Sequence, residues 1–271
     1  MPIKRHFLDG PYGQIHVRTA GQASSAAALV CLHMSPKSSW QFADLMDAMS
    51  PHRFVIAPDN PGHGESARPP ATPHVTIEDY ARCVWTAVDT YTDGPVFLLG
   101  SHTGAMVAVE AAHQRPERVH GIVSQSAPVM TPDEVAQFAN AYEPIPLDEA
   151  GTRIRVLWER VLAHRGPDMP LQLCVESFAE NFRGGDAYEW GHRAAFNYAA
   201  SYAQKLAQLE QRILVINVND DLTEHSRRAD ALMRNGERLE KPAWGHGFLS
   251  VHAQETAHIV ERFCQDVEAA L

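Results

Sequence analysis

The sequence predicts an α/β fold with a largely parallel sheet flanked by helices and a helical segment inserted late in the chain. Short apolar runs alternate with amphipathic stretches, which is the pattern expected when strands alternate with helices. The run at 27–33 is apolar up to its last residue, His33, as a strand buried on both faces requires. With 271 residues, of which 45% are hydrophobic, the chain is long and apolar enough to bury one substantial core.

The elements follow in order along the chain. Strands are expected at 13–21, 27–33, 53–59, 95–100, 121–127, 212–218 and 236–244. Helices are expected at 40–49, 76–91, 103–119 and 226–235, with a closing helix whose buried face carries Ile259, Phe263 and Val267. Thr76 and Asp79 have the spacing of a capping box at the start of the second helix.

Residues 128–205 depart from this alternation. They contain helical segments interrupted by Pro144, Pro146 and the pair Gly184-Gly185. Because this stretch falls between two strands of the sheet, we expect it to form a helical cap. The core domain would then consist of residues 1–127 and 206–271.

Charge and composition restrict the partners. A net charge of -10 disfavours nucleic acid, because phosphate binding needs clustered Lys and Arg. The N-terminus lacks an apolar signal segment, and the apolar runs are too short to span a bilayer. Four dispersed cysteines are then expected to be reduced and buried. These features predict a cytoplasmic protein with a small-molecule substrate and no membrane partner; they specify no oligomeric state.

Five short motifs occur at the ends of the expected strands. They are HMSP at 33–36, PDNPGHGES at 58–66, GSHTGA at 100–105, NDDLTEH at 219–225 and WGHGF at 244–248. In this order they resemble the α/β-hydrolase superfamily, and the resemblance covers almost the whole chain. It implies the α/β-hydrolase fold with a cap.

The resemblance also implies a set of site residues. In the family turn Gly-x-nucleophile-x-Gly, the middle residue is Ser, Cys or Asp, whereas here it is His102. His246 matches the catalytic histidine and Asp221 the acid that orients it, while Asp220 is left as a possible helix cap. The backbone N–H groups of Met34 and Thr103 match the donors of the oxyanion hole.

The replacement of the nucleophile leaves four hypotheses for His102. It attacks a carbonyl itself, it exchanges protons together with His246, it binds a metal with His246 and His33, or the turn is inactive and the protein only binds a ligand. Ser101 precedes the apex and is a poor candidate nucleophile. Acid–base chemistry is slightly favoured, because an imidazole crowds a turn built for a smaller side chain. No metal-ligand spacing is present, so neither a metal nor another cofactor is expected.

The leading prediction is a cofactor-independent hydrolase that acts on an ester, a lactone or an activated C–C bond of a small apolar carbonyl compound. The alternatives are a lyase or isomerase that uses both histidines, and a non-catalytic binding protein. The expected substrate-binding residues are His33, Ser126, Trp158, Trp190, Tyr198 and Phe248.

Overall fold

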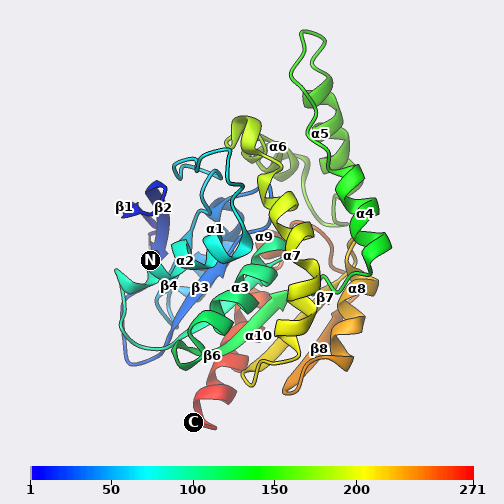
Figure 1. The fold of residues 1–271 in the computed structure, drawn as a ribbon. Helices are drawn as coiled ribbons and strands as arrows, with labels where there is room; N and C mark the ends of the chain where they lie inside the picture. The colour runs from blue at the N-terminus through cyan, green and yellow to red at the C-terminus, as the bar shows by residue number, and fades with distance from the viewer. Residues whose placement is uncertain (1) are drawn as a thin grey trace.

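The computed structural model describes residues 2–271, which form one eight-stranded sheet in the order β1-β2-β4-β3-β5-β6-β7-β8 (Figure 1). The strands are β1 Lys4–Gly10, β2 Gly13–Ala20, β3 Ala28–Leu32, β4 Val55–Pro58, β5 Val96–Ser101, β6 Val119–Gln125, β7 Arg212–Val218 and β8 Gly236–Lys241. Strands β4, β3, β5, β6, β7 and β8 run parallel, whereas β2 is antiparallel to both β1 and β4. The predicted mostly parallel α/β sheet is confirmed.

Helices cover both faces of this sheet. They are α1 Ala43–Met49, α2 Ile77–Asp89, α3 Thr103–Gln114, α4 Pro132–Ala141, α5 Thr152–Ala163, α6 Leu171–Glu180, α7 Trp190–Leu206, α8 Thr223–Arg227, α9 Phe248–Val251 and α10 Ala253–Glu268. The capping box at the start of α2 is present, with Thr76 and Asp79 each bonded to the other's backbone. Short 3-10 turns complete the chain at Ser39–Phe42, Pro116–Arg118, Gly185–Ala187 and Arg228–Ala231.

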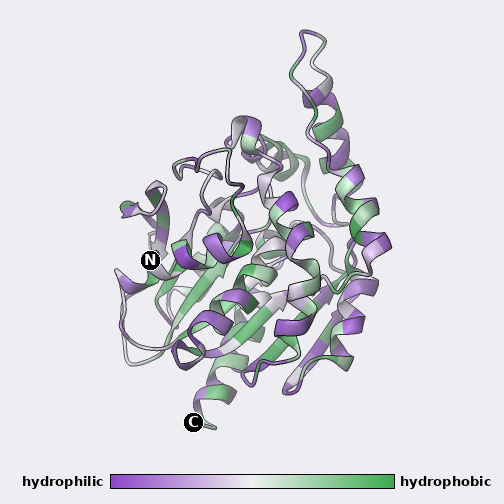
Figure 2. Ribbon diagram, in the orientation of Figure 1, coloured by the Kyte–Doolittle hydropathy of each residue, from purple (hydrophilic) through white to green (hydrophobic). Residues whose placement is uncertain are grey.

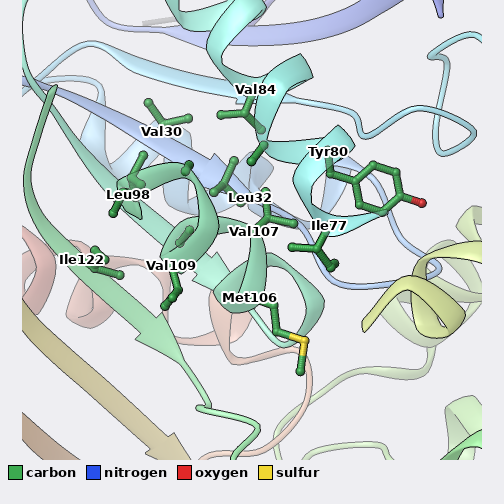
Figure 3. Packing of buried hydrophobic residues seen from close by; sticks show 14 of the residues in the cluster. Val30, Leu32, Ile77, Tyr80, Val84, Leu98, Met106, Val107, Val109 and Ile122 are labelled. Carbon is green, nitrogen blue, oxygen red and sulfur yellow. The ribbon is translucent and has the colours of Figure 1, made fainter. Parts of the chain in front are cut away.

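Two apolar clusters hold the layers together, and strand alternation assigns side chains to each. Val30 and Leu32 of β3 face α2, α3 and α7, while Leu29 and Cys31 face α1, α9 and α10. The strands in the middle of the sheet are accordingly green, the colour of hydrophobic residues, along most of their length in Figure 2. Figure 3 shows Val30, Leu98 and Ile122 of the sheet beside residues of α2 and α3.

The segment between β6 and β7 contains α4 to α7. Helices α4 and α5 extend away from the sheet at the upper right of Figure 1. Helix α7 instead packs against α3, and its residues Tyr198, Tyr202 and Leu206 belong to the main core. The segment proposed as a cap therefore contributes its last helix to a layer of the core.

Two features bear on the predictions about membrane association and about the cysteines. Among residues 2–271, no helix combines the length and apolarity that crossing a bilayer requires. Cys31, Cys83, Cys174 and Cys264 are all buried and free.

Candidate active site

His102 stands at the apex of a sharp turn between β5 and α3. Its backbone has φ 48° and ψ -108°, a strained conformation for a residue with a side chain. A Cβ on Gly100 would lie 2.3 Å from the carbonyl oxygen of Gly104, and one on Gly104 would lie 1.9 Å from that of Leu32. The two glycines let the start of α3 approach β3 and β5, and this close approach fixes the direction in which His102 leaves the backbone.

Two histidine–aspartate pairs meet at this turn. The Nε2 atom of His102 lies 3.0 Å from Oδ2 of Asp220, and Nε2 of His246 lies 3.4 Å from Oδ1 of Asp221. The two imidazole rings have centroids 5.3 Å apart. Consecutive carboxylates after β7 thus serve different histidines, one from the turn after β5 and one from the loop after β8.

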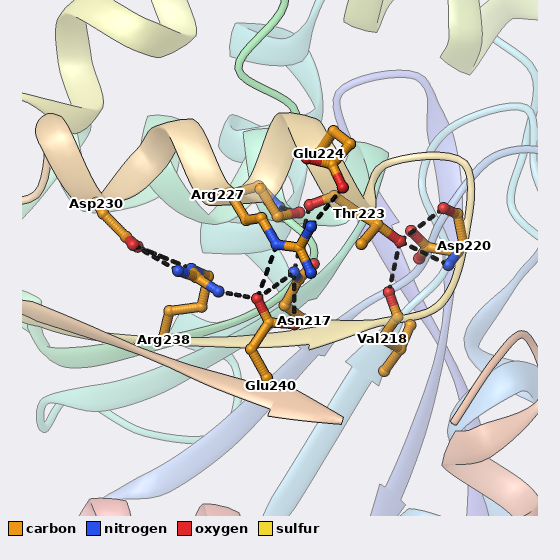
Figure 4. A network of polar contacts seen from close by, with 11 residues as sticks. Asn217, Val218, Asp220, Thr223, Glu224, Arg227, Asp230, Arg238 and Glu240 are labelled. Atoms are coloured by element: carbon orange, nitrogen blue, oxygen red, sulfur yellow. Dashed lines mark hydrogen bonds and ion pairs between the residues drawn. The ribbon is translucent and has the colours of Figure 1, made fainter. Parts of the chain in front are cut away.

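The turn that carries both carboxylates is held by polar contacts around Thr223 (Figure 4). The hydroxyl of Thr223 accepts from the Asp220 N–H at 3.0 Å and lies 2.8 Å from the Val218 carbonyl oxygen. The side chain of Asp220 is fully buried, and it accepts hydrogen bonds from the Leu222 N–H at 2.8 Å and from the Ser126 hydroxyl at 2.9 Å. These contacts place Asp220 at a fixed distance from His102.

The local electrostatics couple each imidazole to its carboxylate. Burial disfavours the charged form of His102, but the Asp220 carboxylate outweighs this effect and the pKa of His102 is raised. Burial likewise opposes the charge on Asp221, but the hydrogen bond with His246 holds its pKa far below the usual range. Burial acts to raise the pKa of Asp220, but the charge and hydrogen bond of His102 help to outweigh it and the pKa is lowered.

A cavity opens over the two pairs. It encloses about 1100 Å³, its mouth included, and its walls contain His102, Asp221 and His246. Most of the remaining walls come from the loop after β3, from α5 and α6, from the start of α7 and from the start of α9. A smaller adjoining pocket is lined by His102, Thr103, Phe138 and Phe196 among others. A ligand that fills either pocket would contact the His102 side chain.

Of the two expected oxyanion-hole donors, the Met34 N–H already has a hydrogen-bond acceptor, whereas the Thr103 N–H has none within its helix. The Met34 N–H donates to Oε1 of Gln41 at 3.0 Å, and the same amide donates through Nε2 to the Ser101 hydroxyl. Thr103 is the first residue of α3, where the backbone N–H has no acceptor within the helix. A substrate oxygen bound at Met34 must therefore displace the Gln41 side chain.

A family model described as the alpha/beta hydrolase fold matches residues 27–253. The chain belongs to the α/β-hydrolase fold family. Curated relatives include Haloalkane dehalogenase 2 of Mycobacterium tuberculosis and of Mycobacterium bovis, each 26% identical over 163 residues. The match covers 59% of this chain and 56% of the dehalogenases, little more than half of their length.

Solved α/β-hydrolase structures match over nearly the whole chain. A putative aryl esterase from Burkholderia cenocepacia has a TM-score of 0.81 at 17% identity and covers 98% of this chain and 100% of its own. Est816, described as an N-acyl homoserine lactone degrading enzyme, has a TM-score of 0.77 at 18% identity, with 95% and 100% covered. Epoxide hydrolase CorEH has a TM-score of 0.75 at 20% identity, with 98% and 100% covered. The predicted α/β-hydrolase fold is confirmed, and these names agree with the hydrolase class expected from the sequence.

In this α/β-hydrolase chain the residues predicted as catalytic lie together. His102, Asp221 and His246 share one cavity, and Phe248 lines it as well. Met34 lines the same cavity, and Thr103 lines the adjoining pocket.

Five residues predicted to bind substrate line neither of these two pockets. His33 is fully buried and bonds the Met34 carbonyl and the Asn60 N–H, so it shapes the loop. Ser126 holds Asp220, and the Tyr198 hydroxyl donates to Glu110 at 2.6 Å. The other two are tryptophans in edge-to-face contact with rings of the protein, Trp158 with Phe178 and Trp190 with His74. The lining of the two pockets therefore gives no support to substrate contact by these five residues.

Sequence reasoning also missed several residues of the site. Asp220, which bonds His102 from behind the cavity wall, is predicted from the sequence only as a helix cap, because one acid is expected after this strand. Gln41, Lys37 and His164 line the cavity, and His164 lies beside His246 with ring centroids 5.4 Å apart. The position of Lys37, three residues after Met34 in the expected oxyanion loop, was the one available signal.

The cluster also contains the donor types of a metal site. One side-chain atom from each of His102, Asp220, Asp221 and His246 lies within 4.8 Å of the others. However, Asp220 already accepts from Ser126, Leu222 and His102. A metal ligated by all four would have to break part of this network, so the arrangement fits paired acid–base groups better.

Proposed function

We propose that this protein hydrolyses an ester, a lactone or an activated C–C bond of a small carbonyl compound, with water as the nucleophile. The observation that carries the proposal is that two imidazoles face one cavity and that each has its own carboxylate. Such pairs can divide the roles of acid and base, because their environments set different protonation states.

His246 is assigned the role of general base. When its Nε2–H donates to Asp221, its Nδ1 atom carries the lone pair that accepts a proton from water. The oxygen of that water attacks the carbonyl carbon, and the carbonyl π electrons move to oxygen. The resulting oxyanion is within the reach expected for the Thr103 N–H, and for the Met34 N–H once Gln41 has moved.

His102 is assigned the role of general acid. Asp220 favours its imidazolium form, which donates Nε2–H to the carboxylate and keeps Nδ1–H for the substrate. Collapse of the tetrahedral intermediate breaks the bond to the leaving group, and His102 protonates that group. The proton taken up by His246 then replaces the one lost by His102, through water or the solvent, so that one water is consumed per turnover.

A substrate screen tests this proposal. Acyl esters, lactones and β-diketones are incubated with the wild type and with His102→Ala, and the products are followed by mass spectrometry. We expect at least one class to gain the mass of water with the wild type, and the rate to fall by about 10²–10⁴-fold in the variant. Equal rates in the two proteins would remove His102 from the mechanism.

A lyase or isomerase is the second candidate, and the bond between Met34 N–H and Gln41 favours it. A reaction without a tetrahedral oxyanion has no need of this donor. The same screen separates the two functions, because isomerisation leaves the substrate mass unchanged and lyase chemistry splits it without adding water.

A further inference from the structure

Lys37 brings a positive charge to the cavity that contains the two histidine pairs. It lies in the loop after β3 and lines the cavity together with Ser177 and Asn181. Its Nζ atom donates to the Ser177 carbonyl at 2.6 Å and to Oδ1 of Asn181. An ammonium has three N–H donors, so one remains beyond these two bonds.

Both partners of Lys37 are neutral oxygens. The acidic side chain of Glu180, one residue before Asn181, has its Oε1 bonded to Nε of Arg183 at 2.6 Å, and its Oε2 accepts from the Ser38 hydroxyl. Within residues 2–271, no carboxylate lies within ion-pair distance of the Lys37 ammonium. A cation that is largely removed from water without a counter-ion is costly. Burial accordingly lowers the pKa of Lys37 to about 7, although Glu180 acts in the opposite direction.

In the cavity walls that the structure describes, the His102 imidazolium and the other Lys or Arg side chain, Arg160, already have carboxylate partners. The Arg160 guanidinium lies 3.4 Å from Oε1 of the buried Glu189 and donates to the Ala141 carbonyl at 2.6 Å. Lys37 is therefore the cation of this cavity that gains the most electrostatic stabilisation when an anion binds. One ammonium with one remaining N–H suits a single charged oxygen, as in a carboxylate, better than a phosphate dianion.

We propose that Lys37, Asn181 and the Ser177 carbonyl form a subsite in which the Lys37 ammonium binds a carboxylate of the substrate. The substrate class is a carbonyl compound with an acid group at its far end, such as a monoester of a dicarboxylic acid or an oxo acid. The inference rests on the proposed function for the reacting end of this molecule. The binding of the carboxylate itself requires no turnover.

Binding of non-reacting probes tests the subsite separately from catalysis. Succinate, glutarate and adipate are compared with their neutral diamides by isothermal titration calorimetry on the whole protein. We expect the wild type to bind at least one dicarboxylate about 10- to 100-fold more tightly than its diamide, as a charge-assisted hydrogen bond permits. Equal affinities for every pair would overturn the proposal without any variant.

Two substitutions then locate the effect. Lys37→Met keeps the length of the chain without its charge, and we expect it to lose the preference for the dicarboxylate; Lys37→Arg should keep it within about threefold. Lys241→Met is the matched control, because Lys241 pairs with Glu255 on the surface. A preference that survives Lys37→Met in a folded protein would assign the anion to another group.

The outcomes also distinguish this inference from the proposed function. Dicarboxylate binding without hydrolysis of any ester, lactone or β-diketone would leave the subsite intact and remove the hydrolase assignment. Ester hydrolysis without a preference for charged probes would leave the hydrolase assignment intact and remove the subsite.

Discussion

The imidazole of His102 is bonded through Nε2 to Oδ2 of Asp220 at 3.0 Å, so the residue that replaces the expected nucleophile has a carboxylate of its own. The side chain of Asp220 is fully buried and that of His102 is 13% exposed. A buried, hydrogen-bonded carboxylate favours the charged imidazole beside it. A charged imidazole has no lone pair with which to attack a carbonyl, so this relationship supports the acid–base role that we propose for His102.

The Asp220→Asn variant tests this relationship through its pH profile. Asp220 raises the pKa of His102, and a general acid loses its proton as the pH rises through that pKa. We expect the alkaline limb of kcat/KM to move to lower pH and the rate at neutral pH to fall by about 10- to 100-fold. Asp230→Asn is the control, since Asp230 pairs with Arg238 near the surface. An unmoved alkaline limb would show that Asp220 does not set the protonation of His102.

Replacement of His102 by Ser distinguishes acid–base from nucleophilic chemistry. A serine could in principle use His246 and Asp221 in the manner of a catalytic triad. If His102 exchanges protons, however, His102→Ser should be as inactive as His102→Ala, because a hydroxyl does not titrate near pH 7. Rapid quench and mass spectrometry of the wild type provide the second measurement. A covalent acyl adduct on His102 would contradict the acid–base assignment.

Gln41 offers a test of the oxyanion hole. Its amide oxygen occupies the Met34 N–H, so a substrate oxygen competes with it. We expect Gln41→Ala to raise kcat/KM for esters by about two- to tenfold, which corresponds to one net hydrogen bond no longer displaced. Because Gln41 also bonds Ser101, the thermal stability of the variant is measured as well, and kcat/KM is compared at a temperature at which both proteins are fully folded. A lower kcat/KM would instead identify the Gln41 amide as part of the catalytic site.

Much of this architecture could be predicted from the sequence, and the exceptions have physical causes. The nearly continuous apolar run at 27–33 predicted β3, because such a run is typical of a strand buried on both faces. The strand β1 was missed, because Lys4–Gly10 is a half-exposed edge strand with mixed polarity. Asp220 was missed because its role depends on where the turn after β5 presents His102, which is a relationship across the sheet.

Substitutions of Leu157 and Trp190 test which apolar residues contact the substrate and which only pack within the protein. Leu157 lines the cavity, whereas Trp190 makes an edge-to-face contact with His74 outside it, with ring centroids 5.1 Å apart. We expect Leu157→Ala to raise KM for bulky substrates with little change in kcat, since apolar contacts bind ground and transition states alike. Trp190→Ala should leave KM unchanged and lower the free energy of unfolding. A raised KM for Trp190→Ala at unchanged stability would show that Trp190 contacts the substrate.

Gly104→Ala tests whether the turn itself depends on close backbone approach. The added Cβ would lie 1.9 Å from the Leu32 carbonyl oxygen, which is main chain and cannot rotate away. We expect a loss of about 3 kcal/mol or more in the free energy of unfolding, as severe overpacking causes, measured by denaturant titration. Gly94→Ala is the matched control, because the nearest atom to its added Cβ is 3.5 Å away on the Thr92 side chain. That variant should change stability by less than about 0.5 kcal/mol.

Because α3 would have to move away from β3 to relieve the clash, any folded Gly104→Ala protein should also lose activity through displacement of His102. Full activity in a stable Gly104→Ala variant would mean that the position of His102 does not depend on this contact.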